Sequence, residues 1–600
     1  MGSKTIRIGC AAGFWGDSSV GAPQLVRHGH IDFLVFDYLA ELTMSILARA
    51  KQKDPGLGYA TDFPAIVMRS VVREIAEQGI RVISNAGGLN PAACAAAVAQ
   101  VAEAAGVKLS IAVVSGDDLM PQVEALRARG VRDLWSGAAL PARVVSANAY
   151  LGAFPIAQAL DRGAQVVITG RCVDSAVELG PLIHAFGWAP TDYDRLAAGS
   201  LAGHLLECGA QATGGLHTDW ERVPDWANIG YPIAECAADG SFVITKPEGT
   251  GGLVTPATVG EQMLYEIHDP GRYLLPDVVC DFTDVRMTQA GEHRVAVQGA
   301  RGAAPTPDYK VAATYADGWR LSAQLTLIGI DAARKARRTG EAILERSRAI
   351  FQSRGLADYR RTRIEALGAE SAYGPHSRAQ QAREVVMRLV AEHQAREPLE
   401  ILAREIAPAG TSWSPGTTGS GLGRQSPVPV VKLFSCLVPK AEVAVSVAVD
   451  GAVQPWAPAP VTASGPERTA PRRYTEFAPL GGTRVEVPLI KLAWARSGDK
   501  GDTENIGVLA RHADFLPVIG QAVTARRVAD YFAYCVDGPV TRYDVPGIQA
   551  FNFVLENALD GGGIASLRAD PLGKGFAQML LDLPVAVPQA LAERHRLLDA

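Results

Sequence analysis

RVISNAGGLNPAACAAAVAQVAEAAGVKLSIAVVSG, residues 81–116, contains a short apolar run, a glycine turn, a helix-forming run and a second apolar run. Strand, turn, helix and strand in this order form the repeating unit of a parallel sheet. Similar apolar runs, each followed by a plausible helix, are IRIGCAA (6–12), FLVFDY (33–38) and QVVITG (165–170). The sequence therefore predicts an α/β fold with a mainly parallel βαβ N-terminal domain.

Three loops follow these predicted strands: GFWGDS at 13–18, NAGGLNP at 85–91 and GRCVDSA at 170–176. Ligands of such sheets gather at the carboxyl ends of the strands. We expect the three loops to line one rim of a site.

A further stretch combines ionisable groups with glycine. In GHLLECGAQATGG (203–215), His204 and Glu207 are three residues apart and share a helix face. FVITKPEGTGG (242–252) predicts a strand ending near Thr245, followed by a helix that Thr255 caps, with Pro256 at its first position. Free N–H groups at such a turn can bind a ligand. The alternative is a solvated helix face followed by a tight turn.

The later part of the chain changes character. Two-residue alternation between about 277 and 330 predicts an antiparallel sheet, helices dominate 331–407 apart from a strand near RIEAL, and VPVVKLFSCL and AEVAVSVAV are strands. We predict a domain over 1–450, with a subdomain over about 277–450, then a Pro/Ala-rich linker over 451–483. Residues 484–600 form a compact α+β domain, in which RSGDKGDTE is a loop.

Composition excludes several functional classes. The chain has 600 residues, 48% hydrophobic and 20% charged, and a formal net charge of -5 without a long basic run, which is unlike a nucleic-acid-binding protein. No apolar run reaches the roughly 18 residues of a membrane span, and the N-terminus has no signal peptide. We expect a cytoplasmic protein whose partners are small molecules or other subunits, as a homo-oligomer.

Familiar cofactor and metal motifs are also missing. The eight cysteines form no CxxC pair, and GxGxxG, GxxxxGK[ST], GxSxG and HExxH do not occur. His28 and His30 can supply two metal ligands, but two histidines at a helix end more often satisfy carbonyls. No metal and no cofactor is predicted from these patterns.

Taken together, SNAGGLNP, VVITGRCVDSA, AGHLLECGAQATGG, ITKPEGTGGLVT, LYEIHDP and SPGTTG resemble the acyclic terpene utilisation protein A (AtuA) family. ARSGDKGD, NIGV, GPVTRYDVPG and GGGIASLR resemble the ferredoxin-fold domain that accompanies it. The resemblance covers roughly 4–450 and 486–586. It implies a role in the breakdown of citronellol- and geraniol-type compounds through coenzyme A thioesters, alongside a biotin carboxylase and a glutaconyl-CoA-type hydratase, with CoA as part of the substrate.

The resemblance carries over no catalytic residue, so the roles are hypotheses from the residues themselves. We expect a hydratase or carbon–carbon lyase, which needs a base, a donor for the enolate oxygen and an apolar pocket. The catalytic candidates are Glu248, Lys246, Glu207, His204, Arg171 and Asp174. The substrate-binding candidates are Asn85, Gly87, Gly88, Gly249, Thr250, Gly251, Gly252, Ser497, Asp499, Lys500 and Asp502.

Each candidate has a structural alternative. Arg171 and Asp174 can pair with each other instead of with substrate, Lys246 and Glu248 can form a surface pair, and the glycine and aspartate of 497–502 suit a hairpin turn. Two rival functions stay open. One is a non-catalytic scaffold subunit of a catabolic complex, and the other is a hydrolase with Cys172 or Cys208 as its nucleophile.

Overall fold

The computed structural model describes residues 4–419, 423–459 and 474–599. Its largest sheet has eleven strands, and five parallel strands form its centre in the order β1-β2-β3-β6-β4. These are the five apolar runs from which the sequence predicted a parallel sheet, and the prediction is confirmed. Their bounds are β1 Thr5–Cys10, β2 Phe33–Phe36, β3 Arg81–Ser84, β4 Ile111–Ser115 and β6 Val166–Thr169.

Helices cover both faces of this sheet because both faces of its strands are apolar. Alternate residues of one strand point to opposite faces: Leu34 and Phe36 pack in one core, and Phe33 and Val35 in the other. The first core is closed by α1 (Gly21–His28), α3 (Arg69–Gln78) and α4 (Pro91–Ala104). The second is closed by α6 (Phe154–Asp161), α7 (Ala176–Phe186) and α8 (Tyr193–Leu206).

Antiparallel strands extend the sheet at both ends. On one side lie β7 (Ile233–Ala237), β8 (Phe242–Thr245), β12 (Arg294–Gln298) and β11 (Arg286–Gly291); on the other lie β19 (Val445–Val449) and β20 (Ala452–Trp456). After β8 the helix α9 (Pro256–Leu264) begins as predicted. The Thr255 side chain accepts a hydrogen bond from the Thr258 amide in a capping box. Three short strands, β9 (Tyr273–Leu274), β10 (Val279–Asp281) and β13 (Arg301–Ala303), form a separate small sheet.

One strand, β14 (Asp308–Ile328), connects the N-terminal sheet region to a second lobe. The stretches YKVAATY (309–315) and WRLSAQLTLI (319–328) both belong to it, with an irregularity between Ala316 and Trp319 where it pairs with β18. The first half of β14 pairs with β5 and the second half with β16 and β17. The bounds are β5 Val144–Ala149, β16 Glu384–His393, β17 Thr417–Gly419 and β18 Val428–Pro439.

The expectation that helices dominate 331–407 apart from RIEAL is wrong at β16. Burial alternates along β16 from Glu384 to Leu389, and the rest of the strand is buried. Its apolar side chains pack on α10 (Ala332–Ser353), and its backbone pairs with both β14 and β15 (Arg361–Leu367). Strand pairing on both sides overrides the helix propensity of residues such as Met387 and Leu389. The helix α11 (Glu397–Glu405) completes this lobe.

The C-terminal domain has a four-stranded antiparallel sheet in the order β22-β23-β25-β24. The predicted loop RSGDKGDTE is instead the tip of a hairpin, because only Gly501 and Asp502 lie between β22 and β23. Of the predicted linker, β20 is a strand and 460–473 lie outside the described residues. The bounds are β21 Arg484–Pro488, β22 Ala493–Lys500, β23 Thr503–Ala510, α13 Leu516–Ala522, α14 Ala525–Tyr531, β24 Val540–Val545, β25 Ala550–Leu555, α15 Phe576–Leu580, β26 Pro584–Pro588 and α16 Gln589–Arg594.

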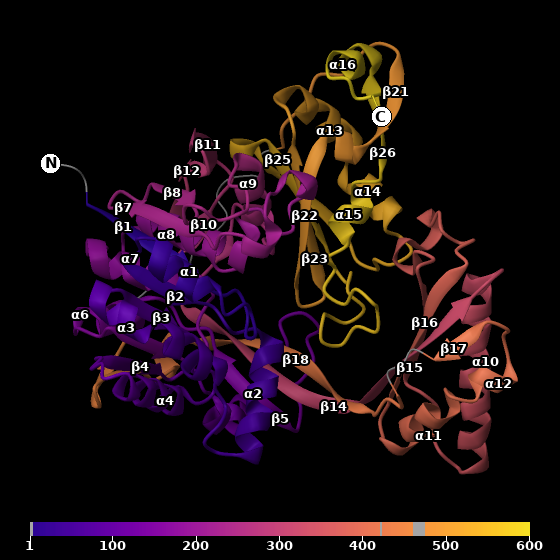
Figure 1. The fold of residues 1–600 in the computed structure, drawn as a ribbon, viewed down its shortest axis with the longest axis horizontal. Helices are drawn as coiled ribbons and strands as arrows, with labels where there is room; N and C mark the ends of the chain where they lie inside the picture. The colour runs from indigo at the N-terminus through magenta and orange to yellow at the C-terminus, as the bar shows by residue number, and fades with distance from the viewer. Residues whose placement is uncertain (1–3, 420–422, 460–473, 600) are drawn as a thin grey trace.

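The C-terminal domain contacts both other parts. In Figure 1 the β22–β23 hairpin lies between the N-terminal sheet and the lobe of β15, β16 and α10. On one side Asn505 donates to the Leu264 carbonyl at 2.7 Å. On the other, Arg388 donates to the Leu567 carbonyl at 2.7 Å. Across the described ranges, no helix is long and apolar enough to cross a membrane.

Candidate active site

Polar side chains follow three neighbouring parallel strands at one edge of the sheet. Asp37 follows β2, Asn85 follows β3 and Arg171 comes two residues after the end of β6. Their exposed fractions are 6%, 0% and 4%. The carboxyl ends of the strands therefore gather a buried polar cluster, where α/β sheets place their ligands.

Asn85 is fixed by protein contacts at this edge. Its Nδ2 donates to Asp37 Oδ1 at 2.5 Å and its Oδ1 accepts the Tyr38 amide at 2.7 Å. The glycines beside it, Gly87 and Gly88, form the turn after β3. A Cβ at Gly87 would lie 2.4 Å from the Thr169 carbonyl oxygen, and Gly88 has φ +52°. This turn orients Asn85, which in turn holds Asp37.

Burial raises the pKa of Asp37 well above its ordinary value, and the negative charge of Asp174 adds to the effect. A second carboxyl of this kind is Glu178, in the first turn of α7, which is 0% exposed. Burial, Glu207 and Asp37 raise its pKa strongly, and neither of its oxygens has a hydrogen-bond partner among the described residues. The cluster therefore holds carboxyls that favour the protonated form.

Arg171 and Asp174 form an ion pair with each other. The Arg171 Nη1 donates to Asp174 Oδ1 at 2.8 Å and to the Cys172 carbonyl at 2.9 Å. Its guanidinium lies 4.2 Å from the centre of the Tyr150 ring. Side-chain exposure is 5% for Arg171 and 25% for Asp174, so the carboxylate is the member of the pair that solvent reaches.

Tyr150 joins Arg171 to two residues that the sequence analysis missed. The Tyr150 hydroxyl donates to Glu41 Oε1 at 2.5 Å, and Lys310 Nζ lies 3.8 Å from that oxygen and 4.8 Å from the Tyr150 ring centre. Burial alone would raise the pKa of Glu41, but Lys310, Arg171 and Tyr150 outweigh it and lower the pKa to about 2. Glu41 is the first residue of α2 (Glu41–Lys53), Tyr150 follows β5 and Lys310 is on β14, so the pairing of β14 with β5 brings Lys310 beside Tyr150.

His204 and Glu207 form the predicted pair at the end of α8, and both are buried. His204 Nδ1 lies 3.1 Å from Glu207 Oε1, and Nε2 lies 3.2 Å from the Met263 carbonyl oxygen. Because a carbonyl only accepts, Nε2 carries the hydrogen, and Nδ1 and Glu207 share one further proton. Burial alone would lower the pKa of His204, but the neighbouring Glu207 outweighs it and raises the pKa. The pKa of Glu207 is also raised, because the effect of burial exceeds the lowering by the charge of His204.

The C-terminal domain adds Lys500 to this cluster. Lys500 ends β22 and donates to Glu266 Oε2 at 2.9 Å, with 35% of its side chain exposed. Burial opposes its charge, but Glu266, Asp174 and Tyr273 raise its pKa. The charge of Lys500 also acts to lower the pKa values of His204, Glu207 and Glu41, while its ion pair with Glu266 holds the hairpin tip against the segment after α9.

Glu266, from LYEIHDP, is the centre of the domain contact. Lys574 Nζ lies 3.1 Å from Glu266 Oε1 and 3.0 Å from Asp499 Oδ1, and donates to the Tyr265 hydroxyl at 2.5 Å. Burial would raise the pKa of Glu266, but Lys500 and Lys574 lower it to about 2. The backbone φ of Glu266 is +57°, a conformation that non-glycine residues hold only where the surroundings enforce it.

His268, two residues further on, has an unused nitrogen. Its Nε2 is buried and has no hydrogen-bond partner in the described ranges. Burial, with Lys500 and Lys310 nearby, lowers the pKa of His268 to about 4, so the imidazole is neutral at physiological pH. A neutral imidazole beside two lysines is a hydrogen-bonding group for a ligand.

The other predicted residues of the hairpin make contacts within the protein. The Ser497 hydroxyl donates to the Gly573 carbonyl at 2.8 Å and accepts the Ala577 amide at 3.0 Å. Asp502 Oδ1 accepts the amides of Leu559 and Gly561 at 2.9 and 3.0 Å. These two side chains shape the hairpin tip, and Lys500 is the residue that it presents to the cluster.

The KPEGTGG turn follows β8, an antiparallel strand on the far side of β7 from β1. Lys246 is 8% exposed and donates to the Thr250 carbonyl at 2.6 Å, whereas Glu248 is exposed. The amides of Gly251 and Gly252 donate to Asn228 and Pro224 carbonyls, and Gly249 has φ +72°. Within the described ranges, the hydrogen bonds of this turn are with its own loop and the 224–230 segment, and none joins it to Glu207 or Lys500.

The surroundings of both cysteines of the hydrolase alternative disfavour the thiolate form. Cys172 is 1% exposed, and burial raises its pKa strongly. Burial and the charges of Glu207 and Glu266 raise the pKa of Cys208 as well. The thiolate is the nucleophilic form, so this environment opposes covalent catalysis at both positions.

The arrangement has a clear chemical character. Three cations come from separate segments, Arg171, Lys310 and Lys500, and the nearby carboxyls differ in tendency: the pKa values of Glu41 and Glu266 are lowered, whereas those of Asp37, Glu178 and Glu207 are raised. Such a site can bind an anionic group and transfer a proton next to it.

Comparison with known proteins identifies two family models in the chain. The model described as acyclic terpene utilisation family protein AtuA matches residues 6–449. The model described as AtuA ferredoxin-like domain matches residues 487–586. No curated protein and no solved structure matches.

Proposed function

The chain belongs to the acyclic terpene utilisation AtuA family, and on this premise we propose that it is an enzyme acting on a carboxylate or CoA thioester of an acyclic terpenoid by proton transfer, as a hydratase or carbon–carbon lyase. The observation that carries the proposal is the buried His204–Glu207 pair, on which the charge of Lys500 acts. Utilisation of acyclic terpenes follows from the family; the reaction type is our inference from the cluster.

Lys310 and Lys500 bind the negative end of the substrate in this proposal. Their side chains are 36% and 35% exposed, so a ligand reaches both. Glu266 raises the pKa of Lys500, and Glu41 opposes the lowering of the Lys310 pKa by burial. Arg171 is buried against the Tyr150 ring, so it adds positive electrostatic potential although little solvent reaches its side chain. A thioester or carboxylate oxygen that gains charge as an enolate forms is stabilised by such fixed cations.

Glu207 is the proposed acid–base group. Its pKa is raised, so it exchanges a proton closer to neutral pH than an exposed carboxylate does. His204 is a positioning residue: it is anchored to the Met263 carbonyl through Nε2 and holds Glu207 Oε1 through Nδ1. His268 Nε2 is the proposed hydrogen-bonding group for the substrate oxygen.

Hydrogen exchange tests the proton-transfer step directly. The full-length protein is incubated in D₂O with the CoA thioester of geranic or citronellic acid, and mass spectrometry measures deuterium entering the acyl chain. The Glu207→Gln variant is expected to lose about 100-fold or more in exchange rate, the usual contribution of a general base. Glu103→Gln, on the exposed face of α4, is the matched control and keeps the wild-type rate.

A second comparison separates Glu207 from Glu248. Exchange that survives in Glu248→Gln but not in Glu207→Gln assigns the base to the buried cluster; the opposite pattern assigns it to the KPEGTGG turn and contradicts our proposal. If the wild-type protein binds the thioester without any exchange, the scaffold alternative is favoured instead.

A further inference from the structure

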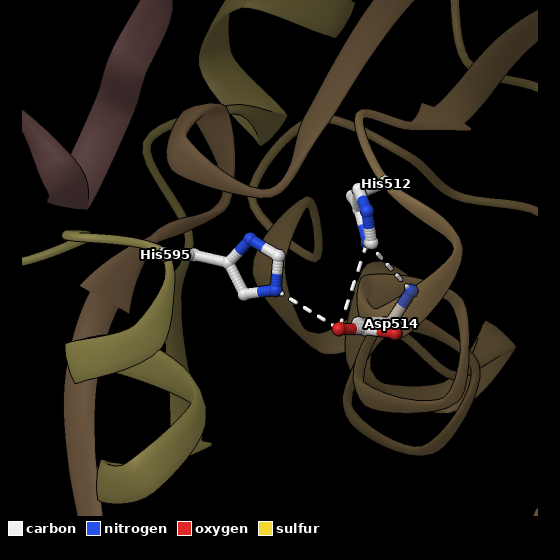
Figure 2. Close-up of side chains that lie close together, drawn as sticks. All are labelled: His512, Asp514 and His595. Carbon is white, nitrogen blue, oxygen red and sulfur yellow. Dashed lines mark hydrogen bonds and ion pairs between the residues drawn. The ribbon is translucent and has the colours of Figure 1, made fainter.

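A second group of potential ligand atoms lies in the C-terminal domain, away from the buried cluster. His512 follows β23, Asp514 is in the turn Ala513–Phe515, and His595 follows α16. Figure 2 shows the three side chains turned toward one another. Within the part of the chain that the structure describes, they are the one group of three His, Cys, Asp or Glu residues whose ligand atoms all lie within 4.8 Å of one another.

The distances suit a small metal ion. Asp514 Oδ2 lies 3.0 Å from His595 Nε2 and 3.7 Å from His512 Nδ1. Atoms that bind one tetrahedral ion at about 2.0–2.1 Å are separated by roughly 3.3 Å. The two distances lie on either side of that value, so an ion can be accommodated by small side-chain rotations.

Ring packing holds the imidazoles in this orientation. The His595 ring lies 4.7 Å from the Phe515 ring, edge to face, and 4.7 Å from the His512 ring. His512 Nδ1 also accepts the Asp514 amide at 3.1 Å. A metal ion on Nδ1 would replace this hydrogen bond, because both use the same lone pair.

We propose that His512, Asp514 and His595 bind a divalent transition-metal ion of the zinc type, with water in the fourth position. Two imidazoles and one carboxylate are ligands that Zn²⁺ accepts readily. The ion would tie the residue after α16 to the turn after β23, closing the C-terminal end of the chain onto the ferredoxin-like domain.

One neighbouring charge opposes the ion. Arg594 Nη1 lies 3.4 Å from Asp514 Oδ2, but 67% of its side chain is exposed, so it can swing into solvent. Removing Arg594 is therefore expected to strengthen metal binding. A hydrogen-bonded cluster without a metal-binding role does not predict such a gain.

The test uses the full-length protein after chelator treatment. Zn²⁺ is titrated by calorimetry, and Co²⁺ is added as an optical probe, because tetrahedral Co²⁺ absorbs in the visible range. We expect about one high-affinity Zn²⁺ per chain, at least about tenfold weaker binding in His512→Ala and in His595→Ala, and equal or tighter binding in Arg594→Ala. His28→Ala removes an exposed histidine elsewhere and leaves the affinity unchanged.

Two outcomes overturn the proposal. One is equal Zn²⁺ affinity in the wild type and in the His512→Ala/His595→Ala double variant. The other is Co²⁺ binding that lacks the visible bands of a tetrahedral site. Circular dichroism of the metal-free variants shows whether each is folded, and Arg594→Ala gives a readout that does not depend on removing a packed ring.

Discussion

Glu178 is a buried carboxyl whose effect on the free energy of unfolding depends on pH. Its pKa is raised in the folded protein, which favours the protonated carboxyl. In the unfolded chain the carboxyl ionises above pH 4.5, its ordinary pKa. The contribution of Glu178 to the free energy of unfolding is therefore greatest below pH 4.5. It falls as pH rises, by up to about 1.4 kcal/mol per pH unit. Glu178→Gln removes the titration. The melting temperature of the variant minus that of the wild type is therefore expected to increase from pH 4 to pH 8.

Differential scanning calorimetry at several pH values measures this difference, which we expect to change on the order of 1 °C per pH unit. Glu103→Gln, an exposed substitution of the same kind, should show no trend. A flat difference for Glu178→Gln would mean that solvent or another group satisfies the carboxylate in the folded protein.

Glu41 has the opposite effect on the pH dependence of stability. Its folded pKa of about 2 is below its ordinary value of 4.5, so its ion pair stabilises the protein above pH 4.5 and is lost as pH falls toward 2. That lowering corresponds to about 3 kcal/mol at most. We expect Glu41→Gln to be less stable than the wild type at pH 7, by up to this amount, with the gap closing in acid. Thermal unfolding at pH 7 and pH 3 tests it; a gap that is equal at both pH values contradicts the charge argument.

Among the elements, the β22–β23 hairpin packs unusually closely on the segment after α9. A Cβ at Gly498 would lie 2.5 Å from Glu266 Cγ and 2.8 Å from the Tyr265 ring. Gly498→Ala is expected to destabilise the protein by about 1–3 kcal/mol, the usual cost of overpacking. If the proposed function is correct, it should also weaken binding of the proposed acyl-CoA substrate, because the hairpin carries Lys500.

Thermal unfolding and substrate titration measure both effects. Gly419→Ala, in strand β17, has no atom within 4 Å of the added Cβ and should be close to neutral. If Gly498→Ala and Gly419→Ala behaved alike, the hairpin would not be held as closely as its contacts indicate.

Elements with a strong local pattern could be predicted from the sequence, and those defined by partners could not. The five central strands are apolar runs, and α9 has its cap and proline in place, so local chemistry specifies them. Strand β16 has helix-forming residues and depends on β14 and β15.

The same holds in the candidate active site. Arg171 follows a predicted strand and His204 lies near the end of a predicted helix, so the sequence pattern points to both. Glu41, Lys310 and Glu266 meet their partners through contacts between segments that are far apart in the sequence.

At the scale of the whole molecule, the three parts are joined by buried and half-buried contacts. Arg511 pairs with Asp219 at 2.6 Å, Asn552 donates to the Ile267 carbonyl at 2.7 Å, and Arg320 donates to the Ile564 carbonyl at 3.4 Å. We expect one cooperative unfolding transition, with calorimetry, tryptophan fluorescence and far-UV circular dichroism giving the same midpoint. Well-separated midpoints would show that the C-terminal domain unfolds independently.

The edge of the largest sheet has a consequence for synthesis on the ribosome. Strand β4 is among the first to emerge, yet its outer neighbour β19 pairs with it from residues 445–449, more than three hundred residues later. Until translation passes that point, the nascent sheet exposes an unpaired apolar edge. The interval during which β4 lacks this partner therefore lasts as long as the synthesis of the intervening residues, and slower elongation lengthens it.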